Sequence, residues 1–115
     1  LVTLPLKWQC SFAIRLLAEI KGFCVASQKP ESTYYIHLIF VNSEERCYGL
    51  GTMMLNEAIE RAVRLNMCEI SLRCPRNNND ALQFYLRYGF TCQGKVIDEV
   101  SGAVGDYLMK YFLLS

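Results

Sequence analysis

The sequence predicts a single α/β domain built on a mixed, largely antiparallel sheet of about six to seven strands, with a central strand–helix–strand crossover and two main helices. Three observations lead to this fold class. The chain has 115 residues, a length typical of one domain. Its residues are 52% hydrophobic and 20% charged, so a packed core is expected rather than disorder. Short apolar runs rich in β-branched and aromatic residues give way to helical spacing in two segments.

Three of these runs predict the first part of the sheet. Strands are expected over Ser11–Ala18 and Gly22–Gln28, with a short turn at residues 19–22 between them. A loop at residues 29–32 separates them from Thr33–Val41, which has the composition of a buried strand. These strands are expected to pair as antiparallel neighbours.

The remaining elements alternate between helix and strand. Leu55 and Ile59 belong to an apolar stripe at three- and four-residue spacing, which predicts an amphipathic helix. Asn78 and Gly89 can cap a second helix at its two ends. Because a strand–helix–strand crossover makes its strands parallel, the sheet should be mixed. The expected elements are a helix over Leu50–Asn66, a strand over Cys68–Arg73, a helix over Asp80–Tyr88, and strands over Phe90–Ile97 and Asp106–Leu114.

Composition argues against several classes of protein. The net charge of +1 argues against a nucleic-acid partner, and no apolar run approaches the roughly 18 residues of a membrane span. The six cysteines lie mostly in apolar or alternating runs, so we expect reduced thiols, with disulfides as the alternative. Reduced thiols favour a cytoplasmic protein, with the nucleus as an alternative compartment. With one histidine and no Cys-x-x-Cys, no metal site is expected. A chain that begins at Leu1 is expected to be processed or a fragment.

A glycine-containing loop carries the third strand into the first helix. Gly49 and Gly51 allow close approach of a ligand to the backbone, and the free amides at a helix start attract anions. Arg46 adds a positive charge there, so the loop is a candidate phosphate or pyrophosphate site. The P-loop motif is absent, and Met54 stands where a dinucleotide fingerprint needs its third glycine. The alternative is that the two glycines serve packing alone.

A second motif follows the next strand. It reads Asn78-x-x-Ala81-x-x-Phe84-Tyr85-x-x-x-Gly89-Phe90, and it comes after Arg46-x-x-Gly49-x-Gly51 in the chain. Together, in this order, the two motifs resemble the GNAT superfamily of acetyl-coenzyme A-dependent N-acetyltransferases over roughly residues 11–114. The resemblance implies the GNAT fold, acetyl-coenzyme A as co-substrate without a metal, and an amine acceptor on a protein or a small molecule.

The resemblance also implies where the coenzyme binds. The pantetheine arm would lie along the main chain of Ile39, Phe40 and Val41, and an amide of Phe40 or Val41 would stabilise the oxyanion. Asn78 matches a polar position that touches the cofactor, and it can cap the helix as well. The pyrophosphate would rest on the segment that comprises Arg46, Cys47, Tyr48, Gly49, Leu50, Gly51 and Thr52.

Three residues are the catalytic candidates. Tyr85 matches the tyrosine that protonates the departing thiolate, and this role is favoured over the alternative of a core aromatic on its helix. His37 is the candidate base, and Tyr35 matches a position used in some protein N-terminal acetyltransferases. Strand alternation predicts that His37 shares one face with Tyr35 and Ile39. The alternative is a packed, hydrogen-bonded histidine without a catalytic role.

Two departures from the family pattern and a short N-terminal region leave the acceptor open. Arg73 stands where some N-terminal acetyltransferases have a histidine, and Cys47 replaces a common glycine or basic residue. The family's usual N-terminal strand and helices are largely absent, so a homodimer or partner subunit is one expected source of the missing acceptor site. A non-catalytic coenzyme A-binding or interaction domain with the same fold is the alternative function. A thiol hydrolase is disfavoured because no nucleophile-elbow motif is present.

Overall fold

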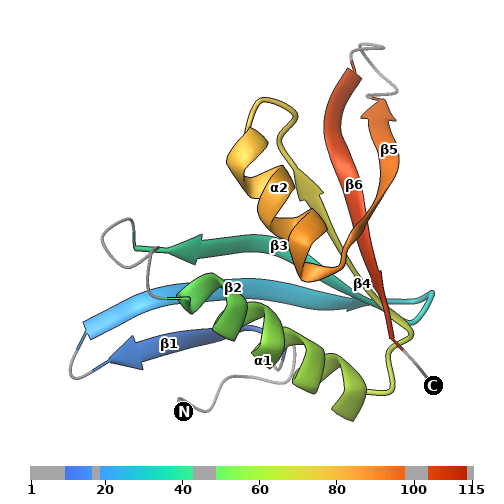
Figure 1. Cartoon of the computed structure of the whole chain (residues 1–115). Helices are drawn as coiled ribbons and strands as arrows, with labels where there is room; N and C mark the ends of the chain where they lie inside the picture. Colours follow the sequence, from blue (N-terminus) through green and yellow to red (C-terminus); the bar gives the residue numbers. More distant parts are fainter. Residues whose placement is uncertain (1–9, 17–18, 43–48, 98–103, 114–115) are drawn as a thin grey trace.

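The computed structural model describes residues 10–16, 19–42, 49–97 and 104–113. Its strands form one six-stranded sheet in the order β1-β2-β3-β4-β6-β5, and both helices lie on the same face of it (Figure 1). The predicted fold class is confirmed. The elements are β1 (Phe12–Leu16), β2 (Glu19–Lys29), β3 (Thr33–Val41), α1 (Leu50–Arg64), β4 (Glu69–Cys74), α2 (Asn79–Tyr88), β5 (Thr91–Ile97) and β6 (Val104–Phe112).

The sheet is mixed in the way the crossover predicts. Strands β1, β2 and β3 pair antiparallel, β3 and β4 pair parallel across α1, and β4, β6 and β5 again pair antiparallel. The second helix ends as expected, since Gly89 takes a positive φ of 127° and its amide donates to the carbonyls of Tyr85 and Leu86. Neither α1 nor α2 has the length and apolar character needed to cross a bilayer.

The predicted turn at residues 19–22 is wrong, because these residues are the beginning of β2. Gly22 pairs with Ile14 on one side and Val41 on the other. A Cβ at Gly22 would lie 2.7 Å from the carbonyl oxygen of Phe40 and 2.9 Å from Sδ of Met54. The glycine therefore permits close packing inside a strand, and it does not mark a turn.

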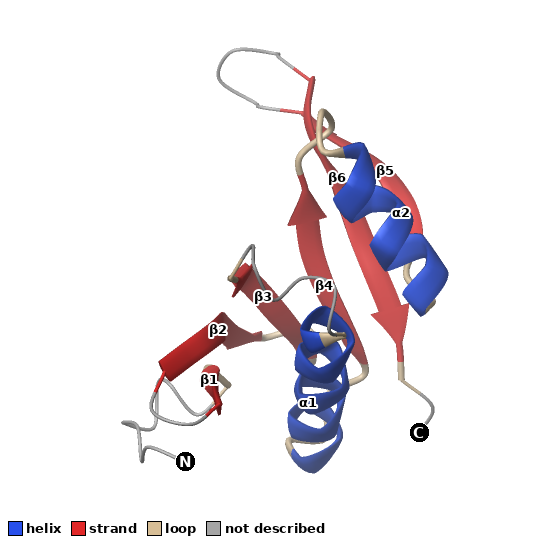
Figure 2. Cartoon of the chain, turned by 60° about the vertical axis from the view of Figure 1, so that its left-hand side comes forward, coloured by secondary structure: helices blue, strands red, loops and turns tan. Residues whose placement is uncertain are grey.

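The core lies between the sheet and the two helices. The apolar face of α1 packs on β2, β3 and β4, and this burial is what orients the helix. The opposite face of the sheet carries no helix in the described part of the chain (Figure 2), and Leu38 and Phe40 are half exposed there. The residues of α1 and the sheet that are almost fully buried include Tyr34, Ile36, Met54, Leu55, Ala58, Ala62 and Ile70.

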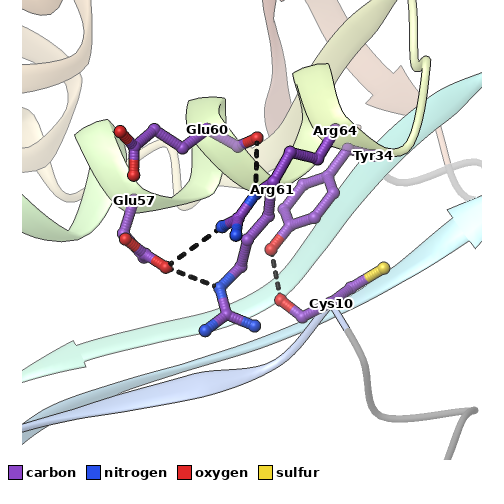
Figure 3. A network of polar contacts seen from close by, with 6 residues as sticks. All are labelled: Cys10, Tyr34, Glu57, Glu60, Arg61 and Arg64. Carbon is purple, nitrogen blue, oxygen red and sulfur yellow. Dashed lines mark hydrogen bonds and ion pairs between the residues drawn. The ribbon is translucent and has the colours of Figure 1, made fainter. Parts of the chain in front are cut away.

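A polar network fixes α1 and the start of β1 to the sheet (Figure 3). The buried Tyr34 hydroxyl donates to the main-chain carbonyl of Cys10. On the helix, Arg61 Nε lies 2.9 Å from Glu57 Oε1, and the Arg61 guanidinium stacks 4.9 Å from the Phe12 ring centroid. The network ties α1, β1 and β3 together beside the strands that carry the candidate site.

Candidate functional site

Strands β3 and β4 pair over four residues each and then separate. Thr33–Ile36 pairs with Glu69–Leu72, whereas the rest of β3 pairs only with β2. Beyond Leu72, β4 continues along β6 (Figure 1). The β4-facing edge of the β3 main chain, from His37 to Val41, therefore has no strand partner within the described residues. Its amides and carbonyls are available to an extended ligand.

A β-bulge begins at this separation, and it changes the faces of the last β3 residues. Val25 pairs with Leu38 and Ala26 pairs with Ile36, so His37 has no partner in β2. The bulge shifts the alternation of side chains by one residue. Ile39 packs against the core beneath the helices, while His37 is exposed on the other face. The prediction that Ile39 shares the face of His37 is therefore wrong.

His37 and Tyr35 do lie together, as predicted. Their ring centroids are 4.8 Å apart in an edge-to-face arrangement. His37 Nε2 lies 2.7 Å from Ser27 Oγ on β2, and Lys29 Nζ lies 5.3 Å from the Tyr35 ring centroid. Partial burial, and then the charge of Lys29, lower the pKa of His37 below its ordinary value of 6.5. His37 is therefore neutral at pH 7, as a base must be.

Tyr85 approaches the same strands from the helix-covered face. It is 8% exposed and packs between Phe84 and Phe90, with ring centroids 5.6 Å away in both cases. Burial, and after it the charges of Cys74 on β4 and Cys24 on β2, raise the pKa of Tyr85 to about 12. The hydroxyl has no hydrogen-bond partner among the described residues. It is a protonated donor held beside the diverging strands.

The start of α1 forms a second part of the site. Gly49, the N-cap, has a φ of 75°, and a Cβ added there would meet no atom within 4 Å. The first turn of α1 contains no acidic residue, and no side chain of the described residues caps it, so its amides have no intrahelical acceptor and lie at the positive end of the helix dipole. Leu50, Gly51 and Thr52 supply these amides. The three other residues predicted for this loop, Arg46, Cys47 and Tyr48, lie outside the described residues.

Gly51 and Asn78 have structural roles that the sequence left open. A Cβ at Gly51 would lie 3.0 Å from the ring of Phe84, so this glycine lets α1 and α2 pack closely. The Asn78 side chain accepts a hydrogen bond of 3.1 Å from the amide of Ala81, so the predicted N-cap is confirmed. Packing alone explains Gly51, whereas the left-handed, open Gly49 is the position that suits a ligand.

The candidate residues therefore form two groups on opposite faces of the sheet. Tyr85 and the start of α1 lie on the helix-covered face, and Tyr35 and His37 lie on the other. Sequence reasoning missed Ser27, because its contact with His37 depends on the β2–β3 register. Within the described residues, no three His, Cys, Asp or Glu side chains come together as a metal site requires.

Comparisons with known proteins indicate the family of the chain. A family model described as acetyltransferase (GNAT) family matches residues 4–90. A curated relative, an uncharacterized N-acetyltransferase from Methanocaldococcus jannaschii, is 40% identical over 55 residues, which cover 48% of this chain and 24% of that protein.

Solved structures share the fold. Ard1 from Thermoplasma volcanium is 25% identical with a TM-score of 0.74, and the match covers 84% of this chain and 65% of that one. A putative streptothricin acetyltransferase from Bacillus anthracis, in complex with acetyl coenzyme A, is 24% identical with a TM-score of 0.80, and the match covers 90% and 61% of the two chains. The chain thus spans less than two thirds of these relatives. Since the family model covers most of its residues, the chain belongs to the acetyltransferase (GNAT) family.

Proposed function

We propose that this chain transfers an acetyl group from acetyl-coenzyme A to a primary amine. The observation that carries the proposal is the separation of β3 from β4 next to the open, left-handed Gly49 at the start of α1. An extended main-chain edge and a helix N-terminus are what a pantetheine arm and a pyrophosphate respectively require. Acetyl-coenzyme A would supply the thioester that the amine attacks.

The residues present fit this ligand. The main chain of Ile39, Phe40 and Val41 would hold the pantetheine arm, and the amides of residues 50–52 would hold the pyrophosphate. The left-handed Gly49 supports this assignment, since a side chain there would be strained and the space around the position is open. Arg46, Cys47, Tyr48 and Asn78 are proposed as further contacts from the family pattern.

Residues on the two faces of the sheet are proposed to carry out the two proton transfers. As the amine nitrogen bonds to the acetyl carbon, the carbon–sulfur bond breaks, the amine loses a proton and the thiolate gains one. His37, neutral at pH 7, is the proposed acceptor of the amine proton, with Tyr35 beside it. An amide of Phe40 or Val41 would stabilise the negative charge on the carbonyl oxygen.

Tyr85 is the proposed donor to the sulfur. Its pKa of about 12 keeps the hydroxyl protonated throughout the neutral range. A donor of this weak acidity stabilises a thiolate chiefly through its hydrogen bond. Its lack of another partner among the described residues leaves the hydroxyl free for that role.

The test is acetylation of an amine and peptide panel, combined with titration of acetyl-coenzyme A. Tyr85→Phe is expected to lower kcat about 100-fold and to leave the Kd of acetyl-coenzyme A within about twofold. Tyr88→Phe is the matched control, because Tyr88 lies one turn further along α2 and its hydroxyl donates to Asn56. His37→Gln is expected to lower kcat to a similar extent.

Three outcomes would count against these assignments. An unchanged kcat in Tyr85→Phe removes Tyr85 from the donor role. Binding of acetyl-coenzyme A without turnover on any acceptor contradicts acetyl transfer and supports a coenzyme-binding module. The absence of binding at high micromolar concentration contradicts both functions.

We also propose a reducing compartment such as the cytoplasm. Cys10, Cys24, Cys68, Cys74 and Cys92 are free thiols, and burial raises the pKa of Cys10, Cys24 and Cys74.

A further inference from the structure

The face of the sheet that carries His37 brings together side chains from four strands. Tyr35 on β3 pairs in register with Ser27 on β2 and with Ser71 on β4, and Ser71 pairs with Lys110 on β6. The next residue of β4 on this face is Arg73, which is exposed while its neighbours Leu72 and Cys74 are buried.

Arg73 and His37 lie on either side of the strand separation. Ile36 and Leu72 are the last pair of β3 and β4, and His37 and Arg73 follow them directly. The guanidinium of Arg73 has no ion pair or hydrogen bond with any residue that the structure describes. Arg73 therefore follows the strand separation on β4 as His37 follows it on β3, and its exposed guanidinium lies on the face from which an acceptor would approach.

Lys29 is a second cation, and it lies on β2, on the other side of β3 from Arg73. Lys29 Nζ is 5.3 Å from the centroid of the Tyr35 ring, and its charge contributes to the lowered pKa of His37. The sequence contains no basic run, so it is the fold that brings these two cations to the strands on either side of β3. It places one cation on β2 and one on β4, with Tyr35 and His37 on the strand between them.

The carboxylates of these strands do not neutralise the two cations. Glu69 lies 3.1 Å from Lys110 Nζ and accepts a hydrogen bond of 3.2 Å from Thr33. Glu19 is bound to Lys21 at 2.8 Å. Asp106 lies further along β6, two residues from the Leu108 that pairs with Arg73, and forms no ion pair within the described residues. Neither Lys29 nor Arg73 therefore forms an ion pair with a carboxylate among the described residues, and the charge of Lys29 helps to lower the pKa of His37.

We propose that Arg73 and Lys29 select acceptors in which a carboxylate accompanies the reacting amine. The inference rests on the proposed acetyl transfer, which requires an amine in the acceptor. The carboxylate is inferred from the two cations on this face of the sheet. A carboxylate can form two parallel hydrogen bonds with the Arg73 guanidinium, whereas the second ammonium of a diamine is repelled by both cations. Two neighbouring cations would also disfavour the protonated form of the acceptor amine, which would leave more of it nucleophilic. A free amino acid and a peptide with an acidic second residue are the two sources of this chemistry.

The experiment compares acceptors that differ only in the carboxylate. Two peptide amides are used, identical except for aspartate or asparagine as the second residue, together with alanine, alaninamide and 1,4-diaminobutane. The expected preference is about tenfold in kcat/KM for aspartate over asparagine, with the diamine the poorest acceptor. Rates with alanine and alaninamide are compared per unprotonated amine, because their amine pKa values differ. A preference for alanine as strong as that for the aspartate peptide assigns the free amino acid as an acceptor.

Variants separate the role of Arg73 from a general effect of charge. Arg73→Gln is expected to bring the aspartate-to-asparagine ratio close to one, Lys29→Gln to lower it in part, and Arg73→Lys to restore much of it. Arg64→Gln is the control of equal charge change, since Arg64 lies on α1 and contacts Glu57 and the Glu60 carbonyl. It is expected to leave the ratio unchanged.

A binding measurement keeps the inference independent of turnover. The N-acetylated forms of the two peptides are titrated into the protein saturated with coenzyme A, and the acetylated aspartate peptide is expected to bind about tenfold more tightly. If no acceptor is acetylated but this difference is present and is lost in Arg73→Gln, acetyl transfer is wrong and the carboxylate selection stands. If acetylation proceeds with equal kcat/KM for the two peptides, or the diamine is the best acceptor, the selection is wrong and acetyl transfer stands. Equal binding of the two products also contradicts the selection.

Discussion

Replacing Thr52 with glutamate separates the fold of the α1 start from its proposed role in binding an anion. Thr52 is exposed in the first turn of α1, which carries no acidic residue. Elsewhere such a carboxylate stabilises a helix, because it faces the positive end of the dipole. If the amides of this turn hold a pyrophosphate, the same carboxylate competes with the ligand and repels it. Stability and affinity should therefore change in opposite directions.

The magnitudes follow from the position of Thr52. A carboxylate near the helix N-terminus contributes about 0.3–1 kcal/mol, which corresponds to a rise in Tm of about 1–5 °C for a chain of this size. A carboxylate about 4 Å from a phosphate charge costs between about 1 and 4 kcal/mol, depending on solvent screening. We therefore expect the Kd of acetyl-coenzyme A to rise at least about fivefold, and up to several hundredfold.

The assay uses Thr52→Gln as the matched control, because glutamine has the same length and no charge. Isothermal titration gives the Kd for acetyl-coenzyme A, and thermal unfolding gives Tm for both variants. Thr52 suits this test better than Gly51, since any side chain at Gly51 also meets the ring of Phe84 at 3.0 Å. Equal affinities of the two variants would refute the assignment of the α1 start as the pyrophosphate site, whatever their stabilities.

Three further predictions concern stability. Burial raises the pKa values of both Cys24 and Tyr85 to about 12, so between about pH 10 and 12 the fold retains protons on these two groups that the unfolded chain loses. In urea unfolding the two groups should contribute full stability below about pH 9 and then a loss of up to about 2.7 kcal/mol per pH unit, and Tyr85→Phe should give a shallower slope than the unchanged chain; equal slopes would contradict the role of Tyr85. Tyr34→Phe should cost about 1–3 kcal/mol in urea unfolding, because it leaves the buried carbonyl of Cys10 without its donor; a change within error would show that this hydrogen bond contributes nothing. Asn78→Ala should cost about 1 kcal/mol, whereas Asn78→Asp keeps the N-cap; equal losses in the two variants would contradict the capping role.

The fold was largely predictable because its signals are local. The apolar stripe around Leu55 and Ile59 defined α1, and the crossover rule then made β3 and β4 parallel. Gly22 is the instructive failure. In the sequence a glycine indicates a turn. The strand requires glycine at this position because Phe40 and Met54 approach it closely, and that approach is seen only in three dimensions.

The sequence was enough to name candidate residues for the site, but it was not enough to predict how they are arranged. The motif positions of Gly49 and Tyr85 pointed to a helix start and to a residue beside the diverging strands. The bulge at His37 could not be read from alternation, because it depends on how Val25 and Ala26 pair across the hairpin. It moves Ile39 to the helix-covered face and leaves His37 on the other. Long-range register likewise determines which cations lie near His37.

Hydrogen exchange with and without acetyl-coenzyme A tests the central claim most directly, since it reports where the coenzyme contacts the main chain. Saturating acetyl-coenzyme A is expected to slow exchange at the amides of Ile39–Val41 and of residues 50–52, while β5 stays unchanged because it lies at the far edge of the sheet. Protection confined to other strands, or no protection in a protein shown to bind the coenzyme, would contradict the proposed site.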